Sequence, residues 1–164
     1  MNCFLTGSNG FIGTRLVEEL SSGGHSVRCL VRSPDKFSNL SGLAGVTPVI
    51  GDLDSVHILE AASKGCDTVF HLAAFAKPWS KDKSLPYRVN LTGTENLLKA
   101  AGRAGVKRFV FTSSAAVIGP SPGVEPIDES FTRTVPLFNE YEETKAAGEE
   151  LVGSTAATGW SALL

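Results

Sequence analysis

The stretch Thr6-Gly7-Ser8-Asn9-Gly10-Phe11-Ile12-Gly13 carries three glycines in a GxxGxxG spacing, directly after an apolar run and at the start of a segment with helical periodicity. In a strand–turn–helix unit, Gly7 would permit the tight turn, Gly10 the close approach of backbone to a pyrophosphate, and Gly13 the packing of helix against strand. An ordinary turn is the alternative interpretation. The position between a first strand and a first helix favours a dinucleotide-binding loop.

Apolar runs and helical segments alternate along the rest of the chain. The runs expected to form buried strands are Cys3–Thr6, Val27–Val31, Val46–Ile50, Thr68–Leu72 and Phe109–Thr112, with Trp160–Leu164 as the start of a sixth. The expected helices are Phe11–Leu20, Ser55–Lys64, a long one around Val89–Ala104, and a last one around Glu140–Ala157. A loop marked by Gly119–Gly123 should precede the last helix. This order predicts an α/β fold with a doubly wound parallel sheet (a Rossmann fold) and helices on both faces.

Composition and charge exclude several classes of partner. The 164 residues have single-domain size, with 42% hydrophobic and 20% charged residues and a formal net charge of −2. This charge offers no basic surface for nucleic acid. The chain contains no apolar run of the roughly 20 residues that span a bilayer, and its N-terminus lacks a signal-peptide pattern. We therefore expect a cytoplasmic protein with no membrane partner.

The cysteines and histidines lack the spacing of a metal site. Cys3, Cys29 and Cys66 each lie in or beside an apolar stretch, which predicts reduced thiols in the core. The three histidines are scattered, and His71 at a strand end is expected to pack or to hydrogen-bond. The sequence therefore predicts no bound metal.

The end of the second strand bears on the choice of cofactor. It reads Val31-Arg32-Ser33-Pro34-Asp35-Lys36, with no acid at the tip to bind the ribose 2′-hydroxyl of NAD. Arg32, alone or with Ser33 or Lys36, could pair with a 2′-phosphate, which favours NADP over NAD. In the alternative interpretation, Arg32 is a solvated surface residue and Asp35 reaches the ribose.

The third strand ends in Gly51-Asp52-Leu53-Asp54. Asp52 could accept a hydrogen bond from the adenine amino group while Leu53 packs on the ring. Asp52 or Asp54 could equally cap the helix that follows. Spacing alone leaves both interpretations open.

A catalytic pair is suggested at the start of the last helix, where Tyr141 and Lys145 lie four residues apart and so on one face. A phenol is a poor acid or base at neutral pH, but a neighbouring ammonium and a nicotinamide cation stabilise its anion. A third polar group from Thr112-Ser113-Ser114, at the end of the fifth strand, could orient a substrate oxygen, and we favour Ser114 over Ser113. The alternatives are a surface Tyr–Lys pair and serines that merely cap the strand.

With these motifs in the same order, the chain resembles the extended short-chain dehydrogenase/reductases. The resemblance also rests on His71-Leu72-Ala73-Ala74, Val89-Asn90-Leu91-Thr92-Gly93-Thr94 and Phe111-Thr112-Ser113-Ser114-Ala115-Ala116-Val117, and it covers essentially the whole chain. It implies that Ser114, Tyr141 and Lys145 are catalytic and that Asn90 is mainly structural. It also implies that Asp52 and Leu53 hold adenine, that Leu72, Ala73 and Ala74 line the cofactor, and that Lys145 bonds the nicotinamide ribose. With the glycine loop and the strand end described above, the expected cofactor-binding residues are Gly7, Asn9, Gly10, Phe11, Ile12, Gly13, Arg32, Lys36, Asp52, Leu53, Leu72, Ala73, Ala74, Tyr141 and Lys145.

Within that family, the Arg32 strand end and the Phe-Thr-Ser-Ser run are most similar to the dihydroflavonol-reductase-like branch. This branch implies hydride transfer between NADP(H) and a ketone, aldehyde or secondary alcohol, with tyrosine as proton donor or acceptor. Two alternatives stay open: a nucleotide-sugar epimerase with bound NAD, and a non-catalytic NADP-binding or sensor protein. The dehydratases carry an Asp-Glu pair that this chain lacks near Ser114.

Family members continue for about as many residues again, and that part holds the substrate-binding lobe. We therefore expect residues 1–164 to be one NAD(P)-binding domain, truncated at the start of the sixth strand, that binds NADP weakly and turns substrate over poorly. By fold-level analogy a homodimer could form through the helices around Val89–Ala104 and Glu140–Ala157. The sequence does not identify the substrate.

Overall fold

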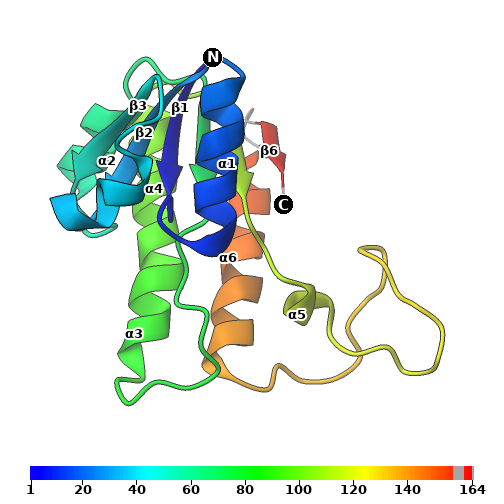
Figure 1. Ribbon diagram of the computed structural model, residues 1–164. Coiled ribbons are helices and arrows are strands. Elements are labelled where there is room, and N and C mark those ends of the chain that lie inside the picture. The colour runs from blue at the N-terminus through cyan, green and yellow to red at the C-terminus, as the bar shows by residue number, and fades with distance from the viewer. Residues whose placement is uncertain (157–160, 164) are drawn as a thin grey trace.

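The computed structural model describes residues 1–156 and 161–163, and within them it holds one twisted sheet of six parallel strands (Figure 1). The order across the sheet is β3-β2-β1-β4-β5-β6. The strands are β1 (Asn2–Thr6), β2 (Ser26–Val31), β3 (Val46–Ile50), β4 (Thr68–His71), β5 (Arg108–Phe111) and β6 (Ser161–Leu163). The chain order reverses between β1 and β4, as in a doubly wound fold. The predicted fold class is confirmed.

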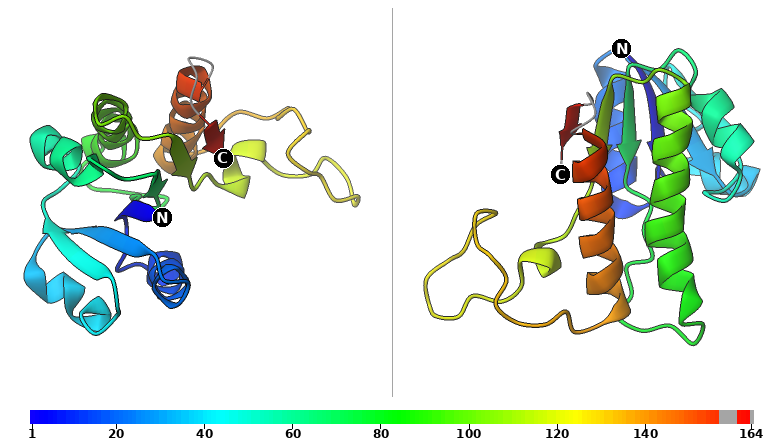
Figure 2. Two further views of the ribbon diagram at one scale, coloured as in Figure 1. Left: turned by 90° about the horizontal axis from the view of Figure 1, so that it is seen from above. Right: turned by 180° about the vertical axis from the view of Figure 1, so that it is seen from behind.

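Helices cover both faces of the sheet (Figure 2). One face carries α1 (Phe11–Ser22) and the 3₁₀ helix Pro34–Leu40. The other carries α2 (Val56–Ser63), α4 (Gly93–Arg103) and α6 (Glu140–Ala156). The final residue of the expected last helix, Ala157, and the ends of the expected sixth strand, Trp160 and Leu164, lie outside the described residues.

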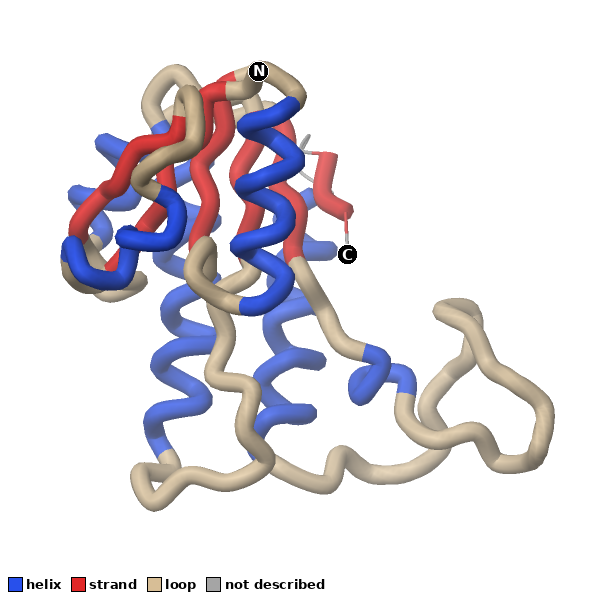
Figure 3. The backbone as a smooth tube through the Cα atoms, viewed as in Figure 1, coloured by secondary structure: helices blue, strands red, loops and turns tan. Residues whose placement is uncertain are grey.

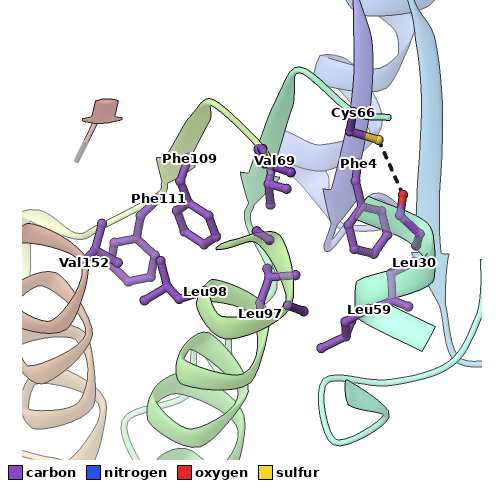
Figure 4. Close-up of a cluster of buried hydrophobic side chains, with 14 residues drawn as sticks. Phe4, Leu30, Leu59, Cys66, Val69, Leu97, Leu98, Phe109, Phe111 and Val152 are labelled. Atoms are coloured by element: carbon purple, nitrogen blue, oxygen red, sulfur yellow. Dashed lines mark hydrogen bonds between the residues drawn. The ribbon is translucent and has the colours of Figure 1, made fainter. Parts of the chain in front are cut away.

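Each face of the sheet has its own core, because successive strand side chains point to opposite faces. On β1, Phe4 packs into the cluster beneath α2 and α4 (Figure 4), whereas Cys3 and Leu5 pack beneath α1. All three cysteines are buried and free, and burial raises the pKa of the Cys29 thiol to about 11. The prediction of reduced core thiols agrees with this packing.

The long helix before β5 begins earlier than the sequence pattern indicated. One turn, α3 (Ser84–Tyr87), continues through a π-helical turn (Arg88–Thr92) into α4. Pro86 lies in the first turn of α3, where the missing N–H of a proline leaves no intrahelical hydrogen bond unmade. No helix within the described residues is long and apolar enough to cross a membrane.

Two short elements were not predicted: the 3₁₀ helix Pro34–Leu40 and the single turn α5 (Ala115–Ile118). After α5, residues 119–139 form the long loop that extends away from the body of the sheet (Figure 3). The loop expected at Gly119–Gly123 is therefore present. Helix α6 begins directly after it, beside α4, and so the loop joins the end of β5 to the start of α6.

Candidate active site

A cleft of about 670 Å³ lies beyond the carboxyl ends of β1, β2, β3 and β4. This is the edge at which doubly wound sheets bind ligands, at the point where strand order reverses. It is lined by Gly7, Asn9, Gly10, Leu30, Val31, Arg32, Gly51, Asp52, Leu53, Asp54, Leu72, Ala73, Ala74, Phe75, Lys77, Leu85, Arg88 and Val89.

The glycine loop has the close backbone contacts that the sequence pattern predicts. Gly7 adopts a φ of +76°, and a Cβ placed on it would lie 2.6 Å from the amide nitrogen of Ala73. A Cβ on Gly13 would lie 2.0 Å from the carbonyl oxygen of Gly7. Side chains at these two positions would push the loop away from both β4 and α1.

The start of α1 fits an anionic group. Gly10 is its exposed N-cap and provides no side-chain hydrogen bond, and the first turn contains no acidic residue. The first N–H groups of a helix lack intrahelical partners and carry partial positive charge. They are therefore suited to a pyrophosphate, with Phe11 and Ile12 exposed at the helix start.

Arg32 lines the cleft at the tip of β2 and is exposed, with no hydrogen bond or ion pair to any described residue. Lys36 and Asp35 do not line the cleft; their charged atoms lie 3.6 Å apart. A hydrogen bond from Ser33 lowers the pKa of Asp35. Of the candidates at this strand end, Arg32 is thus the one that lines the cleft.

Asp52 holds the turn before α2 and also lines the cleft. Its Oδ1 accepts hydrogen bonds from the backbone N–H of Asp54 at 3.1 Å and from the Ser55 hydroxyl at 2.7 Å. Ser55, not either aspartate, is the N-cap of α2. Asp52 therefore holds the turn before the helix through one oxygen while it also lines the cleft beside Leu53.

Leu53 is held against the long helix by two contacts. Its carbonyl accepts a hydrogen bond from the Asn96 side chain at 3.0 Å. A Cβ on Gly93 would lie 2.7 Å from Leu53 Cδ1, so the absent side chain leaves room for the leucine. This packing places an apolar side chain in the wall of the cleft, where an aromatic base would contact it.

His71 fixes the floor of the cleft through a chain of hydrogen bonds. The Thr94 hydroxyl donates to the Asn90 carbonyl at 2.6 Å, so it accepts from Nε2 of His71 at 2.9 Å. Nδ1 then accepts from the Thr6 hydroxyl at 2.6 Å, and the Thr6 oxygen accepts from the Ala73 N–H at 3.3 Å. Burial lowers the pKa of His71 to about 3, with Lys145 adding to the effect. His71 is therefore a neutral hydrogen-bonding residue, the role predicted for it.

Asn90 joins this floor to the helix that carries the candidate catalytic residues. Its side-chain oxygen accepts from the N–H of Phe75 at 2.7 Å, and its amide donates to the Phe75 carbonyl at 3.2 Å and to the Thr144 hydroxyl at 2.9 Å. Asn90 is almost completely buried within the π-helical turn. The arrangement agrees with a structural role.

Lys145 lies next to β5. Its side chain is buried, its ammonium donates a hydrogen bond to the Thr112 carbonyl, and Nζ lies 4.0 Å from the centre of the Phe111 ring. Burial lowers the pKa of Lys145 to about 8, although the carboxylate of Glu149 opposes that shift. This brings the pKa of the amine nearer to the range in which side chains take part in proton transfer.

The two serines at the end of β5 have different partners. Ser113 donates a short hydrogen bond to Glu149 on α6, which occupies its hydroxyl. Ser114 is the N-cap of α5 and accepts from the Ala116 N–H at 3.2 Å, so its hydroxyl proton stays available to an incoming acceptor. This difference supports the choice of Ser114.

Tyr141 lies in the first turn of α6 and is partly buried. Among the described residues, its hydroxyl has no hydrogen-bond partner, so no direct hydrogen bond joins it to Lys145. Ser114, Tyr141 and Lys145 do not line the cleft described above; they lie at the β5–α6 side, one strand further along the sheet. The structure thus brings the residues predicted to bind cofactor and those predicted to be catalytic to the same sheet edge, on adjoining strands.

Sequence reasoning missed half of the residues that line the cleft. Two of them, Lys77 and Arg88, are cations on the segment after β4 and at the start of the π-helical turn. The sequence shows only that both are positively charged and follow the end of a strand. That pattern does not predict a place in the cleft unless the path of the chain after β4 is known. With Arg32, the cleft is thus lined by three cationic side chains and by two acidic ones, Asp52 and Asp54.

Comparison with protein families gives a match over nearly the whole chain. The family model described as the NAD-dependent epimerase/dehydratase family matches residues 3–163. The fold, the glycine loop and the cleft described above all lie within the matched residues.

Individual relatives include reductases and an epimerase. A Synechocystis protein provisionally named dihydroflavonol 4-reductase is 38% identical over 95% of this chain and 45% of its own length. A farnesyl-dihydroquinoline-oxide ketoreductase of Stigmatella aurantiaca is 34% identical over 100% of this chain and 48% of its own length. The structure of Thermus thermophilus UDP-glucose 4-epimerase in complex with NAD matches with a TM-score of 0.86 and 30% identity, over 99% of this chain and 54% of that one. The chain thus spans about half the length of these proteins.

Proposed function

The chain belongs to the NAD-dependent epimerase/dehydratase family, and from this premise we propose that it binds NADP(H) and carries the catalytic side chains of a carbonyl reductase. The proposed reaction transfers hydride between the nicotinamide and a ketone, aldehyde or secondary alcohol. The reductase names of two relatives support this choice, since the chain is similar to both over nearly all of its length.

The observation that carries the cofactor proposal is the unpaired Arg32 at the tip of β2. A guanidinium offers a planar fork of donors that suits a phosphate monoester. Asp35, which could have bound a ribose diol instead, interacts with Ser33 and Lys36 and does not line the cleft. The positive charge of Arg32 therefore matches the 2′-phosphate of NADP. At the tip of β2 no carboxylate of the described residues lines the cleft to accept hydrogen bonds from the ribose diol of NAD.

The catalytic roles follow from what each side chain can donate. When bound, the nicotinamide cofactor supplies the hydride. The Ser114 hydroxyl donates a hydrogen bond to the carbonyl oxygen, Tyr141 donates the proton to that oxygen, and the Lys145 ammonium stabilises the phenolate that remains. The lysine can do so below a pH of about 8, where its amine is charged.

A tyrosine exchange tests this assignment. NADPH oxidation with a panel of ketones and aldehydes is measured for the wild-type chain, for Tyr141→Phe and for the control Tyr87→Phe. Tyr87 is the matched control because its hydroxyl already bonds the Glu143 carboxylate and it does not line the cleft. Loss of a general acid lowers rates by about 100- to 10,000-fold. We expect that loss for Tyr141→Phe alone; equal rates in the two variants would contradict the assignment.

Nucleotide-sugar epimerisation is the second candidate, favoured by the similarity to an NAD-bound UDP-glucose 4-epimerase. An epimerase regenerates its cofactor in every cycle and so retains it. NAD that co-purifies with the chain and survives dialysis would favour the epimerase, whereas exchangeable NADPH favours the reductase.

A further inference from the structure

The loop of residues 119–139 is fastened to the body of the protein by Arg133. Its guanidinium donates hydrogen bonds to the carbonyls of Ala116, Val135 and Pro136 and to the carboxylate of Glu142. The Nη2–Oε2 distance to Glu142 is 2.7 Å. One side chain thus joins α5, the loop and the first turn of α6.

At the α6 end, Arg133 contacts the residue that organises the start of the helix. Asn139 accepts at Oδ1 from the N–H of Glu142 at 3.0 Å, and the Glu142 carboxylate accepts in return from the Asn139 amide and from the Phe138 N–H, each at 3.1 Å. The arrangement resembles a capping box, but here the Glu142 carboxylate accepts from the Asn139 side-chain amide and the Phe138 N–H in place of the Asn139 backbone N–H. Tyr141 is part of the turn that these bonds define.

At the α5 end, Arg133 contacts the turn that begins with Ser114. The Ala116 N–H donates to the Ser114 hydroxyl, while the Ala116 carbonyl accepts from Arg133. Gly119, which ends this turn with a φ of +85°, leaves the space that Arg133 occupies, because a Cβ there would lie 3.1 Å from Nη1. The guanidinium is therefore enclosed by the same turn that positions Ser114.

The Arg133–Glu142 ion pair is more deeply buried than the other ion pairs of the described residues. The side chains of Arg133 and Glu142 are 13% and 12% exposed, and no other ion pair of the described residues has both partners so deeply buried. Exposed pairs contribute little, whereas breaking a buried, multiply hydrogen-bonded pair is costly. Phe138 also packs on the guanidinium, at 5.2 Å from its ring centre.

We propose that Arg133 is a positioning residue that fixes Ser114 and Tyr141 relative to each other, so that both hydroxyls can reach the carbonyl oxygen of the substrate. This inference rests on the function proposed above. The two residues come from different elements separated by a long loop, and Arg133 is bonded to both of their turns. Arg133 does not line the cofactor cleft. Its loss therefore affects the chemical step and not cofactor binding.

The test compares Arg133→Met and Arg133→Lys with Arg103→Met, a control at an exposed ion pair on α4. Misplacement of a reacting group by about 1 Å can cost about 100-fold in rate. We expect Arg133→Met to lower kcat by about 10- to 100-fold with unchanged NADPH affinity, Arg133→Lys to recover part of the loss, and Arg103→Met to behave as wild type. A folded Arg133→Met variant with full kcat, or with kcat and NADPH affinity lost together, would overturn the proposal.

A second pair of variants shows whether Arg133 acts through Glu142. Glu142→Gln keeps the shape of the side chain and removes its charge. If the pair acts as a unit, the double variant Arg133→Met with Glu142→Gln loses no more kcat than Arg133→Met alone. Additive losses would contradict action through the pair.

Fluorine NMR of the chain labelled with 3-fluorotyrosine separates failure of this proposal from failure of the proposed function. The chain has two tyrosines and so gives two signals, which Tyr141→Phe assigns. Arg133→Met should shift or broaden the Tyr141 signal more than that of Tyr87, whose hydroxyl bonds Glu143, whether or not the chain turns over a carbonyl. A Tyr141 signal that does not move would overturn the positioning role even if reductase activity is found.

Discussion

The Nδ1 atom of His71 lies 2.6 Å from the hydroxyl oxygen of Thr6, and the donors around this pair require the imidazole to be neutral. This contact ties the end of β4 to the end of β1, at the point where the strand order of the sheet reverses. Protonation of His71 would turn its acceptor nitrogen into a donor and break the chain of hydrogen bonds beneath the cleft.

Acid should therefore destabilise the fold through His71. Its pKa is lowered to about 3, whereas in the unfolded chain it is near 6.5. Between these values the unfolded state binds more protons, so stability falls by up to about 1.4 kcal/mol for each pH unit below 6.5. Urea unfolding of the wild type, His71→Gln and the exposed control His57→Gln at pH 7, 5.5 and 4 measures this loss. A His71→Gln variant with the same pH dependence as wild type would contradict the assignment.

Gly13 should tolerate no side chain. Because a Cβ there would lie 2.0 Å from the Gly7 carbonyl oxygen, Gly13→Ala must push α1 off the loop, at a cost of about 1–3 kcal/mol. Gly153→Ala is the matched control, since Gly153 lies in α6 with no atom near its Cβ direction, and it should gain up to about 1 kcal/mol. Denaturant unfolding at neutral pH compares the two, and equal stabilities would show that the tight contact is not needed.

The buried, charged ammonium of Lys145 should lower the free energy of unfolding of the protein. Its pKa is lowered to about 8 in the folded state, so from pH 8 to about 10.5 the unfolded chain binds more protons and folding stability rises with pH. Lys145→Met should thus be more stable than wild type at pH 7, and its advantage should shrink at pH 9.5. Lys99→Met, on the exposed face of α4, serves as control and should show no such trend. An advantage for Lys145→Met that stays constant between pH 7 and 9.5 would argue against a buried ammonium.

The parts of the fold that could be predicted from sequence are those with local signals. The strands are mostly apolar runs such as residues 27–31, in which every residue but Arg28 is buried, and the first turn is marked by Gly7 and Gly13. The early start of the long helix and the turn α5 were not predicted, because α3 and α5 each span a single turn, which is too short to show a helical period.

Long-range pairings could not be predicted in the same way. Arg133 and Glu142 occur in a loop and a helix whose sequences show only ordinary charges, and their pairing depends on how the loop returns to the body of the protein. The same holds for Lys77 and Arg88, which enter the cleft from a segment that folds back over it. The role of Ser114 was inferred from its place after a strand, and only the structure shows that Ser113 has a different partner.

The central claim, that the cleft binds NADP(H) through Arg32, is tested most directly by titrating the chain with NADPH and NADH in parallel, following nicotinamide fluorescence. Wild type, Arg32→Asp and the exposed control Arg103→Met are compared. We predict tighter binding of NADPH by the wild type and the control, with the preference abolished in Arg32→Asp because a carboxylate repels the 2′-phosphate. Equal affinity for the two cofactors in the wild type, or a preference for NADPH that survives Arg32→Asp, would contradict the claim.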